Sequence, residues 1–534
     1  MIYAARAALT AAMCASALAA CAHNAAFSPE APHDRMTIVA TFEPKSLDPV
    51  LEAGSNYQLI ADLAFQTLLQ LDDRGRWIPD AALAEPKRSN GGISADGKTV
   101  IFHLRRGLRW QDGAALTARD VRFTYEANLN PQTNVGSREA FLSIAAMTTP
   151  DPYTIVFRLK RPTASFLSDI WTAIVPAHLL QRYPNLNAVP FNGAPVGSGP
   201  YRIVEWKRGD RLTLAANPRY WRGRPKIGAI TVKFVPAGPT ALTQLQTGEA
   251  NFWWNADANL IAELRRLPSA RIALTPIRAW VDVGFNMRDP ALADVRVRSA
   301  IAHALDMPRI AATAAHGVET TDGVLEAAFG WARDPHLAPP AHDEARANRL
   351  LDEAGWVRGA DGARHRNGQT LSLLFVYRNN SATYRVAATM IADALARVGI
   401  RTEQKTYTFA QLTGLAAQGG IMTSGKFALS LDGLVTNPDP DLSWLIACDQ
   451  FAPHGFNYYH YCNRSVDAAL ADAKGTYERA RRLRDYAVVQ RRLLADLPFA
   501  FVYRTREIDV APAWLKNLKP STFSPLWNTW EWHD

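Results

Sequence analysis

Long apolar runs are scarce in this sequence of 534 residues. Apart from the N-terminal leader, Met1 to Ala20, no stretch approaches the roughly twenty apolar residues of a membrane-spanning helix, and the leader itself is too short to span stably. Internal repeats and low-complexity tracts are also missing. With 48% hydrophobic and 20% charged residues, the composition is that of a globular protein large enough for two or three hydrophobic cores.

Signatures of common enzymes are equally scarce, since no HExxH, GxSxG or GxGxxG pattern occurs. The segment from Gly92 to Thr99 does fit the phosphate-loop pattern GxxxxGK[ST]. It is followed by the alternating segment TVIFHL instead of a helix, so we interpret Asp96-Gly97 as a turn that leads into a strand. Asp439 and Asp441 in NPDPD could form an acid–base couple, although the flanking prolines favour a rigid turn. An enzyme is therefore the minority interpretation.

Charge of one sign does not dominate the chain. The 59 Lys and Arg exceed the 50 Asp and Glu by nine. The basic residues are scattered except for short clusters such as Arg105-Arg106 and Arg481-Arg482-Leu483-Arg484, which we interpret as solvated faces. A nucleic-acid-binding protein would show a basic stripe with a docking motif, so this class is disfavoured.

The leader has the anatomy of a secretory signal, with a positive charge at Arg6, an apolar middle and small residues before a break. Its end, Leu18-Ala19-Ala20-Cys21, resembles the lipobox of bacterial lipoproteins. This resemblance implies cleavage before Cys21, acylation of that thiol and a tether over residues 21–34. An ordinary signal peptide (1–20) with an incidental cysteine is the alternative.

Cysteine is rare, with four residues in the whole chain. Cys14 leaves with the leader and Cys21 takes the lipid, which leaves Cys448 and Cys462 as a natural pair. In an oxidising compartment they are expected to form a disulfide worth roughly 3 kcal/mol in the chain-entropy model. A metal site with the intervening His454 and His460 is the alternative, but the tighter spacing that is usual for zinc ligands is missing.

Secondary-structure signals alternate along the body of the chain. Thr99 to Leu104 and Tyr153 to Leu159 place apolar residues at every second position, which predicts half-buried strands. Helical spacing follows in three later segments: ARANRLLDEAG ending at Gly355, YRVAATMIADALARVGI ending at Gly399, and YERARRLRDYAVVQRRLLADLP ending at Pro498. In the second, the buried face is expected to hold Val386, Met390, Ile391, Leu395 and Val398. The chain is thus predicted to be a mixed α/β protein.

Several short motifs occur in a specific order. They are Ser46-Leu47-Asp48-Pro49, Phe65-Gln66-Thr67-Leu68-Leu69, DGKTVIFHLRRGLRWQDGAALTARDV, Gly197-Ser198-Gly199-Pro200-Tyr201, Asn217-Pro218-Arg219-Tyr220-Trp221, VRVRSAIAHALD, LLDEAGW and Pro438-Asp439-Pro440-Asp441. Together they resemble the substrate-binding proteins of peptide-type ABC importers, which include dipeptide-, oligopeptide- and nickel-binding proteins, from about Thr37 to the C-terminus.

This resemblance implies a two-lobed α/β clam shell of the type II periplasmic-binding-protein kind. The first lobe would hold residues 35–284 and 499–534, with an extra subdomain at about 78–196, and the second lobe residues 285–498. Hinge strands would lie near 283–286 and 499–502. A ligand that bridges both lobes would stabilise the closed form, which the membrane permease recognises.

A zwitterionic ligand in such a cleft needs a cation, an anion and flat apolar walls. Arg378 lies near the position where dipeptide-binding relatives carry a carboxylate-pairing arginine, and a solvated loop arginine is the alternative. Candidate walls are Trp253, Trp254, Trp280 and Trp444, for each of which core packing is the alternative.

The anion departs from the family pattern. Relatives carry an aspartate for the peptide amine at a position that corresponds to Thr436, with Asn437 next to it, and neither of these residues can be an anion. Asp432 could substitute from four residues upstream, or the ligand lacks a free amine. The resulting hypothesis is that Arg378 and Asp432 make the charged contacts.

Two classes of function stay open. The first is a monomeric, lipid-anchored, periplasmic binding protein for peptides or peptide-like solutes, including opines and metal chelates, which serves an ABC permease and needs no cofactor. The second is a secreted hydrolase. A chaperone-like or signalling lipoprotein on the same scaffold is a further alternative, because a fold does not select its ligand.

Overall fold

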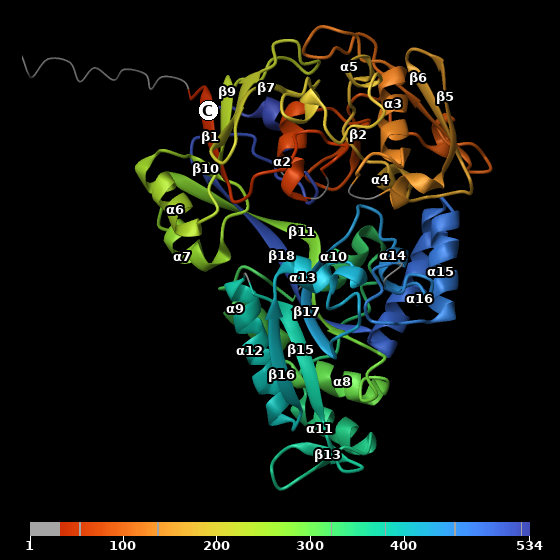
Figure 1. Cartoon of the computed structure of the whole chain (residues 1–534), viewed down its shortest axis with the longest axis vertical. Coiled ribbons are helices and arrows are strands. Elements are labelled where there is room, and N and C mark those ends of the chain that lie inside the picture. Colours follow the sequence, from red (N-terminus) through yellow and green to blue (C-terminus); the bar gives the residue numbers. More distant parts are fainter. Residues whose placement is uncertain are drawn as a thin grey trace, which may run out of the picture.

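Two lobes joined by a pair of long strands make up the molecule (Figure 1). The computed structural model describes residues 33–52, 55–135, 138–321, 323–379, 381–452, 455–524 and 526–534. The joining strands, β11 (Ala270–Phe285) and β18 (Phe499–Pro512), are antiparallel neighbours. The leader with Cys21, and also His454, lie outside the described residues. Among the helices that the structure describes, none has the length and apolar character to cross a membrane.

One ten-stranded mixed sheet runs through both lobes, in the order β16-β15-β17-β11-β18-β10-β1-β9-β8-β7. Strands β1, β9 and β10 are parallel in the first lobe, as are β15, β16 and β17 in the second, while β11 pairs antiparallel with both β17 and β18. The bounds of the other strands of this sheet are β1 Arg35–Ala40, β7 Tyr201–Lys207, β8 Arg211–Ala216, β9 Ala229–Phe234, β10 Phe252–Trp253, β15 Ser372–Arg378, β16 Arg401–Tyr407 and β17 Leu429–Val435.

The first lobe carries an additional subdomain built on a three-stranded sheet, β4 (Thr99–His103), β6 (Thr154–Leu159) and β5 (Ile144–Asp151). Its core packs the sheet against α3 (Ala118–Leu129) around the fully buried Trp110. A hairpin of β2 (Leu69–Leu71) and β3 (Trp77–Pro79) adds to this unit. Figure 1 shows α3, β5 and β6 at one end of the first lobe, directly above α15 and α16.

Helices cover the sheets of both lobes, and separate hydrophobic cores lie beneath them. The second lobe packs α8, α9, α11 and α12 against its strands, and a further core beside it holds α10, α14, α15 and α16. The remaining helix bounds are α2 Ser55–Ala64, α4 Phe166–Asp169, α5 Ala177–Leu180, α6 Gly238–Thr247, α7 Ile261–Leu264, α8 Val295–Ala304, α9 Met307–Ala314, α10 Val324–Phe329, α11 Glu344–Glu353, α12 Ala382–Arg397, α13 Phe409–Thr413, α14 Ser443–Ile446, α15 Arg464–Gly475 and α16 Arg479–Asp496. Three short strands, β12 Val357–Arg358, β13 Arg364–Arg366 and β14 Gln369–Thr370, form a small separate sheet.

The strands and helices predicted from periodicity are confirmed. Both alternating segments are strands, β4 and β6, and all three segments with helical spacing are helices, α11, α12 and α16. Gly97 has φ +69°, so the phosphate-loop look-alike is a turn that leads into β4, as expected. A strand after the loop directs its backbone away from the convergent arrangement that phosphate binding needs.

The predicted buried face of α12 is wrong at its first member. Val386 is 40% exposed, while Ala387, Ala388, Ile391, Ala394 and Leu395 are buried. The buried stripe therefore begins one residue later and is made largely of alanines. A periodicity argument that follows large apolar side chains does not register such small residues.

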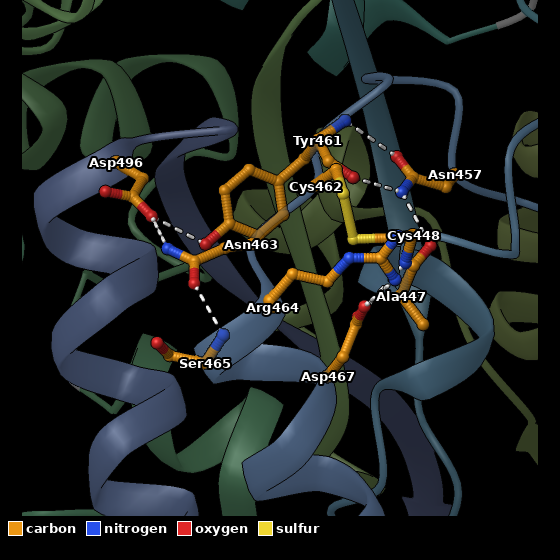
Figure 2. Close-up of a disulfide and its surroundings, with 10 residues drawn as sticks. All are labelled: Ala447, Cys448, Asn457, Tyr461, Cys462, Asn463, Arg464, Ser465, Asp467 and Asp496. Carbon is orange, nitrogen blue, oxygen red and sulfur yellow. Dashed lines mark hydrogen bonds and ion pairs between the residues drawn. A yellow bond between two sulfur atoms is a disulfide. The ribbon is translucent and has the colours of Figure 1, made fainter.

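Cys448 and Cys462, the pair expected from the sequence, are bonded in the structure (Figure 2). The two Cα atoms lie 4.6 Å apart. Asn457 closes the same loop from inside, because its side-chain amide donates to the carbonyls of Ala447 at 3.0 Å and Tyr461 at 2.8 Å. Within the described residues, no group of three or more His, Cys, Asp and Glu is placed to hold a metal ion.

Candidate functional site: the cleft between the lobes

Two adjoining cavities, of about 880 and 790 Å³, lie between the lobes. Each is lined from both sides, by the β2–β3 hairpin of the first lobe and by the segments around Trp331 and Pro438 of the second. Both volumes fall in the range of small-molecule binding sites. A ligand in either cavity would contact both lobes at once.

The tip of the β2–β3 hairpin, Asp73 to Arg76, lines the cleft from the first lobe. The buried carboxylate of Asp72 fixes this tip by accepting from the backbone N–H groups of Arg74 and Arg76, each at 2.9 Å, and from Arg76 Nε at 2.8 Å. Gly75 has φ +68°, a conformation that favours glycine. The sequence DDRGR therefore builds a rigid turn that holds the Arg74 backbone at the cleft.

Arg278, on β11, lines the cavity nearer to the joining strands. Its guanidinium is buried and donates to the carbonyl oxygens of Ala327 and Ala328, each at 3.0 Å, and of Pro438 at 3.4 Å. It forms no ion pair with a carboxylate of the described residues. Burial lowers the pKa of Arg278 to about 10, so the group remains charged near neutral pH.

Arg504 of β18 lines the same cavity. Its side chain is 11% exposed and reaches Glu326 at 3.7 Å, a long ion pair. Burial and the neighbouring Arg506 lower the pKa of Arg504. Across the cavity, the ring of Phe523 from the first lobe lies 6.0 Å from the Arg278 guanidinium carbon and forms an apolar wall.

The second cavity holds Arg479 and Arg482 of α16 beside Trp331. The guanidinium carbons lie 4.5 and 5.1 Å from the Trp331 ring. Arg482 is buried and donates to both carboxylate oxygens of Asp439 at 2.7 Å, while Tyr486 donates to the same carboxylate at 3.2 Å. Asp439 is thus neutralised within the second lobe and is not free to accept from a ligand amine.

Tyr477 closes one edge of the cleft by joining the lobes directly. Its hydroxyl donates to the carbonyl oxygen of Thr163 at 2.9 Å, and its ring lies 5.5 Å from the guanidinium of Arg88. Beside it, the Ala164 N–H donates to the carbonyl oxygen of Lys474 at 2.8 Å. The described conformation is therefore one in which the two lobes touch.

Arg378 and Asp432, the pair predicted to hold the ligand's charges, form an ion pair with each other at 2.5 Å. Arg378 ends β15 and Asp432 lies in β17, next to it in the sheet. The guanidinium of Arg378 also stacks on Phe409 at 4.5 Å. The two cavities described above are lined by other residues.

A second carboxyl faces this pair, because Asp282 on β11 is the register partner of Asp432. Burial, together with the charge on Asp432, raises the pKa of Asp282 well above its ordinary value. Burial also raises the pKa of Asp432, against the opposing effect of Arg378. Trp280 Nε1 donates to Asp282 at 2.9 Å, and the Tyr459 hydroxyl donates to it at 3.2 Å.

The other predicted contacts lie in different surroundings. Trp253, Trp254 and Trp280 are at most 2% exposed and belong to hydrophobic cores, which favours the core-packing alternative for them. Trp444 is partly buried, with its ring 5.8 Å from that of Phe456.

Thr436 and Asn437, where the family resemblance predicts an aspartate, differ in burial. Thr436 is buried, and its single hydroxyl hydrogen has two carbonyl acceptors within reach, Ala327 at 3.1 Å and Arg278 at 3.2 Å, while its oxygen accepts from Arg278 Nε. Asn437 is exposed. Thr436 thus helps to position the cation of Arg278.

Asp439 and Asp441 form two separate ion pairs instead of an acid–base couple. Asp439 pairs with Arg482, as described above, and Asp441 pairs with Lys474 at 2.8 Å. Each carboxylate is thus bound by a separate cation, which fits the rigid-turn alternative.

The interpretation of the basic clusters as solvated faces is wrong for two members. Arg482 is buried in the cleft, although its neighbours Arg481 and Arg484 are exposed. Arg105 stacks on Trp221, with its guanidinium carbon 4.0 Å from the ring centroid. Helix geometry turns position 482 inward while 481 and 484 face solvent, which a count of basic residues does not reveal.

Sequence reasoning missed the residues that line the cleft, above all Arg278, Trp331, Arg479 and Arg504. The one local signal was Arg278, which with Asp282 is one of two charged residues in the mainly apolar segment IRAWVDVGF. A cation in such a strand needs a special reason to be buried.

Known proteins resemble this chain in both sequence and fold. A model of the bacterial extracellular solute-binding proteins, family 5 Middle, matches residues 79–451. The chain belongs to this family. The solute-binding protein is thereby a substrate-binding component of an ABC importer, of a family that serves transport and not catalysis.

Two curated relatives and one solved structure show how far the likeness extends. The oligopeptide-binding protein AppA of Bacillus subtilis is 26% identical over 84% of this chain and 83% of its own length. The glutathione-binding protein GsiB of Pectobacterium atrosepticum is 27% identical over 86% and 87%. The crystal structure of NikZ from Campylobacter jejuni in complex with Ni(L-His) superposes with a TM-score of 0.80 at 24% identity, covering 94% of this chain and all of the other. The two-lobed fold of the solute-binding protein is therefore shared over nearly its whole length.

Proposed function

We propose that this protein captures peptides or peptide-like solutes by closure of its two lobes and delivers them unchanged to a membrane permease. The observation that carries the proposal is the pair of cavities lined from both lobes. A ligand that contacts both lobes favours the closed form by its differential affinity for that form. The relatives named for oligopeptide and glutathione binding support a peptide-sized ligand.

We propose the same division of the chain into two lobes that the sequence analysis predicted. Residues 35–284 and 499–534 would form the first lobe, with the subdomain at about 78–196, and residues 285–498 the second. The position of β11 and β18 between the lobes supports hinges in these two strands. The irregular pairing between Pro276 and Trp280 supports a bend there, because a bulge interrupts the ladder.

We also propose that the mature protein is a monomer, anchored to a membrane in the periplasm through lipid on Cys21. The lipobox-like sequence before Cys21 supports this placement. Mass spectrometry of the purified protein tests it, since a diacylglyceryl-modified Cys21 as the first residue is expected. An unmodified N-terminus at another position would contradict the anchor.

Denaturation of the purified full chain, followed by mass spectrometry of the released small molecules, tests the binding function. The solute that is found should restore thermal stability to the emptied protein, by about 2.7 kcal/mol at a hundred times its dissociation constant. It should also be recovered chemically unchanged after prolonged incubation. Turnover of the solute would favour the hydrolase, and absence of any stabilising solute would contradict binding.

Contact of Arg378 and Asp432 with the ligand stays a prediction. Because each now neutralises the other, a zwitterionic ligand would have to exchange this pair, giving its carboxylate to Arg378 and its amine to Asp432. The double variant Arg378→Gln/Asp432→Asn removes both charges together and avoids an unpaired buried ion. A loss of affinity of about tenfold is expected, and unchanged affinity would exclude the pair from the site.

A further inference from the structure

Positive charge is concentrated in the cleft. Its two cavities are lined by ten Lys and Arg side chains but only four Asp and Glu, whereas the whole chain has 59 against 50. The basic residues are Arg74, Arg76, Lys87, Arg88, Arg278, Arg333, Arg479, Arg482, Arg504 and Lys519. Charges of one sign on the walls of a cleft raise the local concentration of ligands of the opposite sign.

Arg278 provides a buried cation that the protein itself leaves without a counter-ion. Only carbonyl oxygens and the Thr436 hydroxyl of the described residues accept from its guanidinium. The packing holds it in place, because a Cβ added at Gly330 would lie 1.9 Å from Arg278 Nη1. Buried charges are normally paired, so an anion in the adjoining cavity would complete this site.

The second cavity also offers cationic groups beyond its internal pairs. Arg482 Nε is buried and finds no hydrogen-bond partner among the described residues, even though Arg482 Nη2 holds Asp439. Arg479 is exposed and makes its stacking contact with Trp331, while its guanidinium forms no ion pair with a described carboxylate. A planar guanidinium on an aromatic face can still bind a carboxylate through its edge.

Three of the four carboxylates that line the cleft, those of Glu85, Glu326 and Asp439, are already paired, and only the exposed Asp73 forms no ion pair among the described residues. Asp439 is held by Arg482, Asp441 by Lys474 and Asp432 by Arg378. Of the acidic residues that line the cleft, Glu85 also pairs internally, with Lys87 at 2.9 Å. Five of the ten cations are paired in the same way, which leaves five cations and one anion of the described lining residues without an ion pair: Arg74, Arg88, Arg278, Arg333 and Arg479, and Asp73.

We propose that the cleft selects solutes with at least two carboxylate groups, one held in the cavity of Arg278 and Arg504 and another beside Arg479 and Arg482. This inference rests on the proposed binding function and adds the chemical class of the solute. Acidic peptides and free polycarboxylates share this chemistry. Trp331, which lines both cavities, provides the apolar surface between the two anionic ends.

Titration calorimetry with matched probes tests the selection on the full chain, purified in detergent and emptied of bound solute. The probes are the pentapeptides Ala-Glu-Ala-Glu-Ala, Ala-Gln-Ala-Gln-Ala and Ala-Lys-Ala-Lys-Ala, and citrate alone. The glutamate peptide should bind at least about tenfold more tightly than its glutamine isostere, because charge-assisted hydrogen bonds are roughly twice as strong as neutral ones. The lysine peptide should bind most weakly. Citrate that binds more tightly than the glutamate peptide would identify a polycarboxylate as the solute.

Two arginines on α16 supply a matched pair of variants. Arg479→Gln removes a charge that lines the cleft, whereas Arg484→Gln removes an exposed charge from the same helix away from the two cavities. Arg479→Gln should weaken the glutamate peptide about tenfold and leave the glutamine peptide unchanged. Arg484→Gln should change neither. Arg504→Gln, in the other cavity, should repeat the effect of Arg479→Gln.

The outcomes separate this inference from the function on which it rests. Equal affinity for the glutamate and glutamine peptides, or tighter binding of the lysine peptide, would overturn the anion selection and leave solute binding intact. Equal effects of Arg479→Gln and Arg484→Gln would overturn the assigned site. If no probe binds although a neutral or basic solute is released from the purified protein, the anion selection alone fails. If no solute is released and none stabilises the protein, the binding function fails as well.

Discussion

Asp48, in the Ser46-Leu47-Asp48-Pro49 motif, is a buried carboxyl whose role is local. Its Oδ1 accepts from the Val50 N–H at 2.9 Å, and its own N–H donates to Ser46 Oγ at 3.0 Å, which together fix the turn after β1. Its Oδ2 is buried and has no partner among the described residues. Burial therefore raises the pKa of Asp48 from 3.8 to about 7. The same effect, burial of a charge without full compensation, recurs at Arg278 with the opposite sign.

Asp48→Asn should change how stability depends on pH. The stability from a raised carboxyl pKa is fully present below pH 3.8 and is lost as the pH rises through about 7, at about 1.4 kcal/mol per pH unit between these two values. The variant keeps the Oδ1 acceptor but cannot ionise. Urea unfolding of both proteins at several pH values between 4 and 8 should show wild type losing free energy of unfolding relative to the variant. Parallel curves would mean that Asp48 does not titrate in this range.

At the scale of elements, the segment between Cys448 and Cys462 connects α16 of the second lobe with strand β11 through hydrogen bonds. Tyr459, near its end, donates to Asp282 on β11, and Tyr461 donates to Asp496 at the end of α16. The disulfide and the Asn457 amide both hold the ends of this segment together. Covalent and hydrogen-bonded closure therefore act on the same loop.

The double variant Cys448→Ser/Cys462→Ser separates these two contributions. With a sequence separation of 14, the chain-entropy model predicts a loss of roughly 3 kcal/mol in the free energy of unfolding. Guanidinium unfolding measures it, and reduced wild type should match the variant as a control. A loss close to zero would show that the Asn457 hydrogen bonds are sufficient to close the loop.

At the scale of the whole molecule, the contact of Tyr477 with the subdomain bears on the balance between open and closed lobes. Its hydroxyl bonds across the cleft to Thr163, so this bond exists only while the lobes touch. A bond present in one state alone shifts the equilibrium toward that state. Ligand affinity includes this shift, since the closed form is the one that holds the ligand from both sides.

Tyr477→Phe should therefore weaken binding through the lost contact between the lobes, because the ring that lines the second cavity is kept and only the hydroxyl is removed. A hydrogen bond worth about 1 kcal/mol corresponds to roughly fivefold in the dissociation constant. Calorimetry with the solute released from the purified protein measures the affinity, and small-angle scattering should show a larger radius of gyration for the ligand-free variant. Tyr153→Phe is the control, because it removes a tyrosine hydroxyl from the subdomain away from the contact between the lobes, and it should behave as wild type. Unchanged affinity in Tyr477→Phe would exclude a role of this contact in closure.

Local patterns in the sequence were sufficient for the elements. Alternation predicted β4 and β6, helical spacing predicted α11, α12 and α16, and the order of short motifs predicted the two-lobed fold. These features depend on residues within one turn or strand of each other, or on family motifs that keep their order. The cysteine pair could also be predicted from the sequence, because only two cysteines were left to combine.

The proposed binding site depends on the tertiary structure. Arg278, Trp331, Arg479 and Arg504 are separated by up to 226 residues along the chain and meet only because β11, β18 and α16 converge at the cleft. The same packing pairs Arg378 with Asp432, although the sequence analysis predicted that each of them contacts a ligand. Charge and burial depend on neighbours distant in sequence, so the residues themselves determined the fold and the presence of cations, and packing determined which of those cations remained free for a ligand.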